Sequence, residues 1–110
     1  VFLNRLKKKM RLQSDPTVIY GITRGTVKLK RELTRDDLKK KSPFNTYQID
    51  GLPPNPICNP SKSSIYAVAN PLETDFLYFV ANGKGGHNFS KTLQQHNRFV
   101  KEYRRLKGTN

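Results

Sequence analysis

The chain has 110 residues, of which 35% are hydrophobic, and this length allows one domain with one modest core. Its 21 Lys and Arg residues against 8 Asp and Glu residues give a net charge of +13, which predicts attraction to a polyanion such as nucleic acid, an anionic membrane surface or an acidic polymer. A single cysteine, Cys58, excludes an internal disulfide, and no segment has the apolar length of a membrane span or the layout of a signal peptide.

The first expected helix covers Val1 to Met10, where apolar residues follow a helical stripe and Asn4, Arg5 and Lys7 to Lys9 are expected to point outward. Because the pattern is already under way at Val1, the chain looks like the carboxy-terminal piece of something longer.

A second helix is expected to start at Asp15-Pro16. Asp15 can accept hydrogen bonds from unpaired backbone N–H groups, and Pro16 suits the first helical position because it lacks an N–H. Val18, Ile19 and Ile22 would supply its buried faces. Taken alone, the stretch favours a capped helix over a functional site.

Two further segments follow the second helix. The Gly-punctuated, basic stretch from Gly21 to Lys30 allows a short strand or an exposed loop. Thr34 and Asp37 have the spacing of a capping box and predict a short helix that ends in Lys39 to Lys41.

The segment from Ser42 to Ser61 holds five of the seven prolines, so regular structure is not expected across most of it. Its apolar and aromatic residues argue against disorder, since such residues order a loop by being buried. We interpret it as an ordered loop that lines a cleft, or as a loop that only braces the core. Its candidate polar contacts are Asn45, Thr46, Tyr47 and Asn59.

The remaining elements are a helix, a hairpin and a terminal helix. Asn59-Pro60-Ser61 predicts a helix start, with the helix over Ile65 to Asn70 and a stop at Pro71. A β-hairpin is expected over 76–90, with strands at 76–81 and 87–90 around the Gly-rich run 82–86. Thr92 and Gln95 predict the cap of a last helix, with Leu93, Val100, Tyr103 and Leu106 inward. The predicted fold class is therefore α+β, with helices around a small antiparallel sheet.

Several chemical motifs are weak. The Gly83-Lys-Gly-Gly86 run lacks the Gly-Lys-Ser/Thr ending of a phosphate loop, and a hairpin turn explains its glycines better. His87, His96 and Cys58 lack a close-spaced ligand pair for zinc, and Cys58 has no activating signature. We therefore expect no metal and no cofactor.

Nucleic-acid binding is the main alternative on composition. Phe and Tyr interleaved with Lys and Arg can stack bases and pair phosphates. These aromatics also follow the strand and helix periodicity that a core requires, and no nucleic-acid motif is present. We therefore expect no nucleic-acid partner.

Neutral hydrogen-bonding residues gather around Gln13 to Thr17, Asn45 to Tyr47 and His87 to Asn97, and such groups suit a sugar polymer. Cleavage of a glycosidic bond also needs a carboxylic acid that donates a proton to the leaving oxygen. Among the 8 acidic residues only Asp15 lies in such a motif, and a capping role would keep it ionised. The proton donor is therefore expected outside this chain.

Together the motifs resemble the catalytic domain of the endolytic murein transglycosylases, the MltG or YceG-like family. The resemblance runs from Val1 to about Tyr103, in family order. The matching segments are Val1–Leu6, Met10–Tyr20, Ser42–Tyr47, Gly51–Pro54, Pro56–Pro60, Leu77–Ala81 and Gly85–Ser90 through His96–Asn97.

The resemblance implies that the chain is part of a lyase that cleaves peptidoglycan glycan strands and leaves 1,6-anhydro-muramic acid ends. It implies a general-acid glutamate upstream of Val1, a LysM-like region, a membrane anchor, a location at the bacterial inner membrane facing the periplasm or cell-wall side, and cell-wall synthases as possible partners. The chain would be the C-terminal portion of the catalytic domain and inactive alone.

The residues expected to bind the glycan or to position the acid come from four places in the chain. They are Gln13, Ser14, Asp15, Thr17, Asn45, Thr46, Tyr47, Asn59, His87, Ser90, His96 and Asn97.

Overall fold

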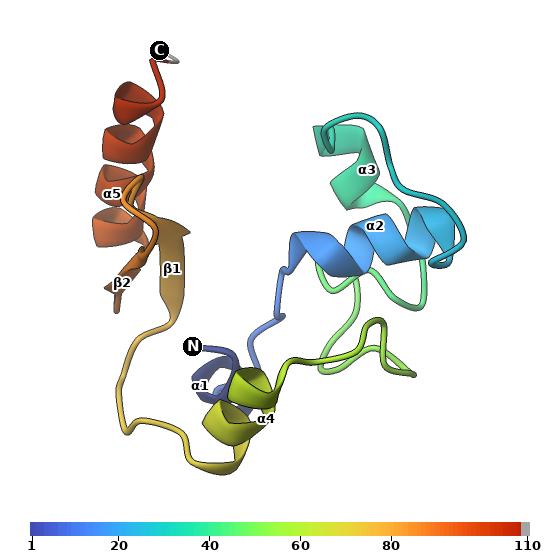
Figure 1. Cartoon of the computed structure of the whole chain (residues 1–110), viewed down its shortest axis with the longest axis horizontal. Helices are drawn as coiled ribbons and strands as arrows, with labels where there is room; N and C mark the ends of the chain where they lie inside the picture. The colour runs from blue at the N-terminus through green and yellow to red at the C-terminus, as the bar shows by residue number, and fades with distance from the viewer. Residues whose placement is uncertain (109–110) are drawn as a thin grey trace. The chain divides into compact units, whose positions relative to one another are not determined.

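The computed structural model describes residues 1–108, which contain five helices and one two-stranded antiparallel sheet (Figure 1). The predicted α+β class is confirmed. These residues form two compact units, one from Arg5–Leu72 and one from Val1–Asn4 together with the described residues from Glu73 onward. Within the described residues, no helix combines the length and the apolar character that crossing a membrane requires.

Helix α1 covers Phe2–Lys7. It is shorter than the predicted stretch, which extended to Met10. Its first residues belong to the unit that contains the hairpin. Asn4 donates to the carbonyls of Thr74 at 2.8 Å and Phe76 at 2.9 Å, and the Phe2 ring meets Phe79 edge-on at 5.6 Å. The start of α1 is thereby tied to the chain that leads into the sheet.

Helix α2 covers Asp15–Thr23 and begins one residue earlier than predicted. Ser14 is the N-cap residue, with extended backbone, and no side chain caps the first turn. Asp15 is therefore the first helical residue and not the cap, because its carboxylate turns to another partner described below. The helix ends at Thr23, and its C-cap residue is Arg24, a left-handed residue with φ of 54° whose N–H donates to the Tyr20 carbonyl.

The small core of the Arg5–Leu72 unit lies beside α2. Its buried apolar side chains are Leu12, Val18 and Phe44, and Phe44 packs edge-on against Tyr20 at 4.8 Å. Gly21 brings α2 close to the following segment, since a Cβ there would lie 2.7 Å from the Ser42 hydroxyl. The expected burial of Ile22 is wrong, because that side chain stays 37% exposed at the end of the helix.

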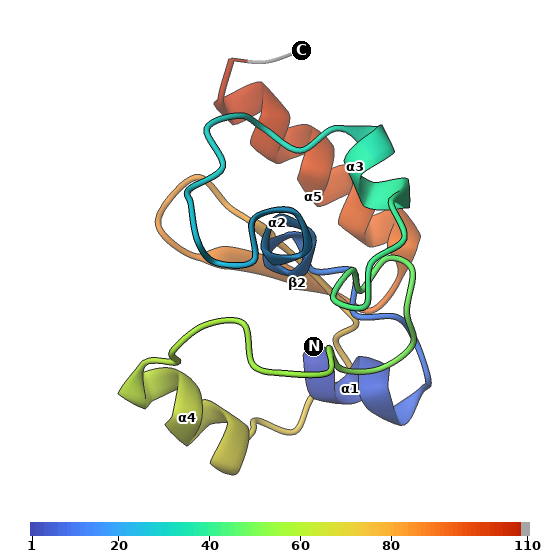
Figure 2. The ribbon, with the colours of Figure 1, turned by 90° about the vertical axis from the view of Figure 1, so that its right-hand side faces the viewer.

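Helix α3, Arg35–Lys39, forms where the capping box was predicted, after a loop that contains no strand (Figure 2). The Thr34 hydroxyl accepts from the Asp37 N–H at 3.1 Å, and the Thr34 N–H donates to the Asp37 carboxylate at 2.8 Å. Two N–H groups that a helix start leaves unpaired are satisfied by these bonds. The capping box is confirmed.

The proline-rich segment 42–61 contains no helix or strand, as predicted. Only its first part is buried: Phe44, Asn45 and Thr46 are each at most 5% exposed, whereas Leu52 is 68% exposed. The expectation that apolar residues order the loop by burial is therefore confirmed at Phe44 and wrong at Leu52, and the hydrogen bonds of Asn45, Thr46 and Gln48 also hold the first part of the segment.

Helix α4, Lys62–Ala69, starts after Ser61, whose hydroxyl accepts from the Ser64 N–H at 3.2 Å, and it ends before Pro71 as predicted. None of its residues is buried. Ile65, Tyr66 and Val68 are more than half exposed, and so is Leu72 beyond the helix.

The hairpin consists of β1, Tyr78–Ala81, and β2, His87–Ser90, so the first strand begins two residues later than predicted. Phe79 pairs with Phe89 and Tyr78 with Ser90. The Asn82 side chain accepts from the N–H groups of Lys84 and Gly86, and Gly83 and Gly85 have positive φ. The glycine run is thus a hairpin turn, as expected.

Helix α5, Leu93–Leu106, packs along both strands of the hairpin (Figure 1). The Thr92 hydroxyl accepts from the Gln95 N–H at 3.2 Å, which confirms the predicted N-cap. Leu93 and Leu106 are each 55% exposed, so their predicted inward position is wrong. One face of a two-stranded sheet is too narrow to cover both ends of a helix of 14 residues.

Candidate functional site

The connection between α1 and α2 bends at Gln13, and this bend together with the first turn of α2 is called the 13–17 turn. Gln13 adopts a left-handed backbone with φ of 49°, which a residue other than glycine holds only when its surroundings impose it. Thr46 supplies two of those contacts. The Gln13 N–H donates to the Thr46 carbonyl at 3.2 Å, and the Ser14 N–H donates to the Thr46 hydroxyl at 2.9 Å.

Two buried threonines lock this turn to α2. The Thr17 and Thr46 hydroxyls lie 2.8 Å apart, and Thr17 donates to the Ser14 carbonyl at 2.6 Å. A hydroxyl carries one proton, so Thr46 must donate to Thr17. Thr17 is 6% exposed and Thr46 fully buried, so both side chains are occupied with protein partners. Their position suits support of the turn and not contact with a ligand.

Tyr47 and Asp15 form the shortest side-chain pair at this turn. The Tyr47 hydroxyl donates to the Asp15 carboxylate at 2.6 Å. Burial of the ring, followed by this hydrogen bond and the charge of Asp15, raises the pKa of Tyr47 above its ordinary value, while the nearby Arg5 charge lowers it in part. Tyr47 is therefore a hydrogen-bond donor at neutral pH and not a base.

Arg5 was missed as a site residue because α1 was expected to turn it outward. It is 7% exposed, and its Nη1 donates to the Arg11 carbonyl at 3.0 Å, the Leu12 carbonyl at 3.3 Å and Gln13 Oε1 at 3.4 Å. The one sequence signal was a charged residue inside the largely apolar motif at 1–6. Arg5 is thus a second residue, besides Thr46, that holds the turn.

Arg11 adds an outer clamp at the surface. Its Nε donates to Asp50 at 3.1 Å, and its Nη1 donates to the Tyr47 carbonyl at 3.0 Å. The Asp50 side chain is 87% exposed, so this ion pair adds little stability, although it orients the chain around Tyr47.

Asn45 and Asn59 occupy contrasting positions. Asn45 is 1% exposed, and its amide nitrogen donates to the carbonyls of Leu38 and Lys40 while its oxygen accepts from the Tyr47 N–H. Its hydrogen-bonding capacity is therefore used within the protein. Asn59 is exposed near the start of α4.

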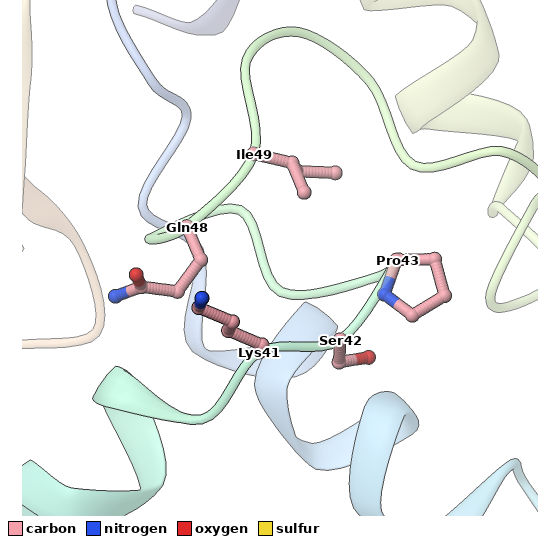
Figure 3. Close-up of a pocket in the computed structure, with 5 residues that line it drawn as sticks. All are labelled: Lys41, Ser42, Pro43, Gln48 and Ile49. Carbon is pink, nitrogen blue, oxygen red and sulfur yellow. The ribbon is translucent and has the colours of Figure 1, made fainter.

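A hollow of about 420 Å³ lies at the start of the proline-rich segment, and none of the predicted polar contacts of that segment lines it. Figure 3 shows the side chains that line it, which are those of Lys41, Ser42, Pro43, Gln48 and Ile49. A second hollow of about 280 Å³ includes Asn45 in its lining. The polar groups of the 13–17 turn lie outside both linings.

The other predicted site residues belong to the hairpin and α5. His87 is exposed at the start of β2, with its ring 5.6 Å from that of Phe79. His96 stacks on Tyr78 at 5.2 Å, and Asn97 is exposed one residue further on. Ser90 is fully buried, and its hydroxyl has no hydrogen-bond partner among the described residues.

The predicted residues thus fall into separate groups. Within the Arg5–Leu72 unit the structure brings together Gln13, Ser14, Asp15, Thr17, Thr46 and Tyr47, with Asn45 adjacent in the chain. His87, Ser90, His96 and Asn97 belong to the unit that contains the hairpin. In residues 1–108 no three His, Cys, Asp or Glu side chains gather as a metal site would require, and Cys58 is exposed.

The turn offers hydrogen bonds but no general acid. A carboxyl that donates a proton at neutral pH is usually desolvated, which raises its pKa. Asp15 is exposed. Asp37, the buried carboxyl among the described residues, has its pKa lowered by hydrogen bonds from the Arg31 side chain and the Thr34 N–H. The turn can therefore orient a polar ligand, and protonation of a leaving group requires another residue.

Comparison with known proteins finds relatives that share one name. The chain is 48% identical over 103 residues to an endolytic murein transglycosylase of Bacillus subtilis (strain 168), covering 94% of this chain and 28% of that protein. It is 35% identical over 107 residues to the protein of that name from Streptococcus pneumoniae (strain ATCC BAA-255 / R6), covering 94% and 19%.

A solved structure shows the same fold. A crystal structure of a YceG-like protein from Listeria monocytogenes aligns with a TM-score of 0.78 at 50% identity, covering 88% of this chain and 31% of that one. The chain thus spans less than a third of the length of these relatives. The family model described as the YceG-like family matches residues 1–102. That match takes in nearly the whole sequence, and the chain belongs to the YceG-like family.

Proposed function

We propose that this chain supplies the glycan-binding wall of an endolytic murein transglycosylase. The observation that carries the proposal is the identity of 48% with the Bacillus subtilis enzyme across 94% of this chain. The geometry agrees, since Gln13, Asp15 and Tyr47 present amide, carboxylate and phenol groups on a turn whose other polar groups are bonded internally. Such a set of neutral and anionic hydrogen-bonding groups suits a sugar polymer.

The reaction proposed for the whole enzyme is cleavage of a glycan strand without water. The 6-hydroxyl of the muramic acid attacks its own C1 carbon and forms the 1,6-anhydro ring, while the glycosidic bond breaks and the leaving oxygen takes a proton from a carboxylic acid. The resulting carboxylate takes the proton that the 6-hydroxyl loses, which restores the acid. We assign that acid to a glutamate upstream of Val1, because neither Asp15 nor Asp37 has the environment of a general acid.

Within this proposal the candidate residues take two roles. Candidate residues that are not buried would contact sugar, and these are Gln13, Ser14, Asp15, Tyr47, Asn59, His87, His96 and Asn97. Thr17, Asn45, Thr46 and Ser90 are buried and would hold those residues in place. The proposed setting is the bacterial inner membrane facing the cell wall, by a membrane anchor outside these residues, with cell-wall synthases as possible partners.

The test uses the full gene product on uncrosslinked peptidoglycan glycan strands, with products analysed by mass spectrometry. We expect strands that end in 1,6-anhydro-muramic acid, and no such product from the 110 residues alone. Hydrolysed, reducing ends from the full protein, or no cleavage at all, would rule the proposal out. A coding sequence without a glutamate-bearing helix upstream of Val1 would also contradict it.

Tyr47→Phe tests the turn within that assay. The substitution removes the 2.6 Å bond to Asp15 and should lower cleavage about tenfold, because one hydrogen bond that orients a carboxylate is lost. Tyr66→Phe is the matched control, because Tyr66 is 68% exposed on α4. Equal activity of the two variants would remove the Tyr47–Asp15 pair from the site.

A further inference from the structure

The Arg5 side chain determines which way the Gln13 amide points. Arg5 Nη1 lies 3.4 Å from Gln13 Oε1. A guanidinium group has only donors, so the amide atom that faces it must be the oxygen. The amide nitrogen of Gln13 then points away from Arg5, and it makes no hydrogen bond within residues 1–108.

The backbone of Gln13 is held just as firmly as its side chain. Its φ of 49° is maintained by the Gln13 N–H bond to the Thr46 carbonyl and by the Arg5 bonds to the Arg11 and Leu12 carbonyls. Gln13 is nonetheless an exposed residue. A strained and clamped residue that stays exposed is typical of a binding position, because pre-organisation lowers the entropy lost on binding.

A donor and an acceptor lie two residues apart in the chain at this turn. Two residues after Gln13, the exposed Asp15 carboxylate accepts one hydrogen bond from Tyr47, which leaves further acceptor capacity. An N-acetylated sugar carries the complementary pair, an acetamido carbonyl that only accepts and hydroxyls that can donate. The turn therefore matches one amino sugar in both polarities.

We propose that Gln13 donates its amide N–H to the acetamido carbonyl oxygen of an N-acetylated sugar in the glycan, and that Arg5 is the positioning residue that fixes this orientation. The inference rests on the proposed function, since the glycan is the ligand assumed there. The inference adds the direction of the hydrogen bond, from Gln13 to the sugar. It also adds Arg5, a residue that the sequence pattern placed in solvent.

The deciding variant is Gln13→Glu in the full gene product. A carboxylate has the same shape as the amide and keeps an oxygen toward the buried Arg5 guanidinium, so the melting temperature should stay equal or rise. The outward N–H is replaced by an acceptor, so KM for soluble glycan strands should rise about tenfold with little change in kcat. Gln94→Glu, on an exposed glutamine of α5, makes the same charge change and should leave KM unaltered.

Arg5→Lys tests the positioning role. Lysine keeps the charge, but its side chain is one bond shorter than that of arginine, so its ammonium would fall short of the position from which Nη1 contacts the two carbonyls and the Gln13 amide, and KM should rise several-fold. If Arg5 acts through Gln13, adding Arg5→Lys to Gln13→Ala should raise KM no further. A further increase in that double variant would show that Arg5 acts by another route.

The outcomes separate the two proposals. An inactive wild-type protein refutes the proposed function. An active wild type whose KM is unchanged in Gln13→Glu, with the melting temperature retained, refutes the donor role of Gln13. Loss of melting stability in Gln13→Glu would refute the Arg5 orientation, because a carboxylate beside that guanidinium should bind it more tightly than an amide.

Discussion

Hydroxyl and amide groups, more than apolar side chains, hold the 13–17 turn in place. The fully buried side chains of the described residues are Asn45, Thr46 and Ser90, and two of these three bond directly to the turn or to Tyr47. Each such bond contributes about 1 kcal/mol, but a partner left unpaired in the interior costs about 1 to 3 kcal/mol. The turn therefore depends on complete pairing of its polar groups.

Asn45→Ala should lower the free energy of unfolding by about 2 to 3 kcal/mol, because the Lys40 carbonyl and the Tyr47 N–H lose their partner. Chemical denaturation of the full gene product, followed by a probe in this unit, measures the change. Asn55→Ala is the control on the same segment, since Asn55 is exposed. Equal midpoints for the two variants would mean that the Asn45 bonds contribute nothing.

Single residues also show which contacts can be predicted from the sequence and which cannot. The Thr34–Asp37 box was predictable because its partners lie three residues apart and bond within one turn. The Thr17–Thr46 pair spans 29 residues, and no local rule relates two threonines at that distance. The motifs at 10–20 and 42–47 could be named as parts of one site, but their pairing required the structure.

Among the elements, α3 has the clearest dependence on a single charge. Asp37 is 3% exposed and accepts from Arg31 at 2.6 Å and 3.1 Å and from the Thr34 N–H. These bonds, led by that from Arg31, hold the pKa of Asp37 well below its ordinary value. The stabilisation is present above the pKa of an unfolded aspartate and is lost as the pH falls from there toward the folded pKa.

Asp37→Asn should remove this acid dependence. In the wild type the melting temperature should be steady from about pH 7 to about pH 5 and should fall below about pH 4, where the unfolded carboxyl begins to bind its proton. The variant should melt lower at neutral pH and show a shallower fall in acid. Asp36→Asn, on the same turn but exposed, should keep the wild-type profile. An unchanged acid slope in Asp37→Asn would contradict the assignment.

Helix ends were easier to foresee than helix faces. Ser61 and Thr92 cap α4 and α5 as their sequences indicate. The faces of α1 and α5 were partly misassigned because periodicity says which residues share a side, and the neighbours decide what covers it. Arg5 is buried because its guanidinium donates to the backbone carbonyls of Arg11 and Leu12. Leu93 and Leu106 are exposed because they extend past the two strands of the sheet.

At the scale of the whole molecule, sequence patterns correctly indicated the α+β class, the family and the irregular 42–61 segment. They could not indicate that the described residues divide into two compact units, because that depends on long-range contacts. The predicted site residues are shared between those units, and their common function remains a prediction that the cleavage assays address.

Helix α4 has a practical consequence for handling the chain. Four apolar side chains are exposed on or beside this helix: Ile65 at 57%, Tyr66 at 68%, Val68 at 66% and Leu72 at 89%. They can attract the same residues of a second copy, whereas the net charge of +13 makes the copies repel one another. Salt shortens the reach of that repulsion from about 10 Å at 0.1 M to about 3 Å at 1 M and leaves the apolar attraction intact. The 110 residues should therefore be monomeric in dilute buffer and self-associate in strong salt, as light scattering would measure, and Ile65→Ser with Val68→Ser should abolish the effect. Association that weakens as salt is added would instead indicate ionic contacts.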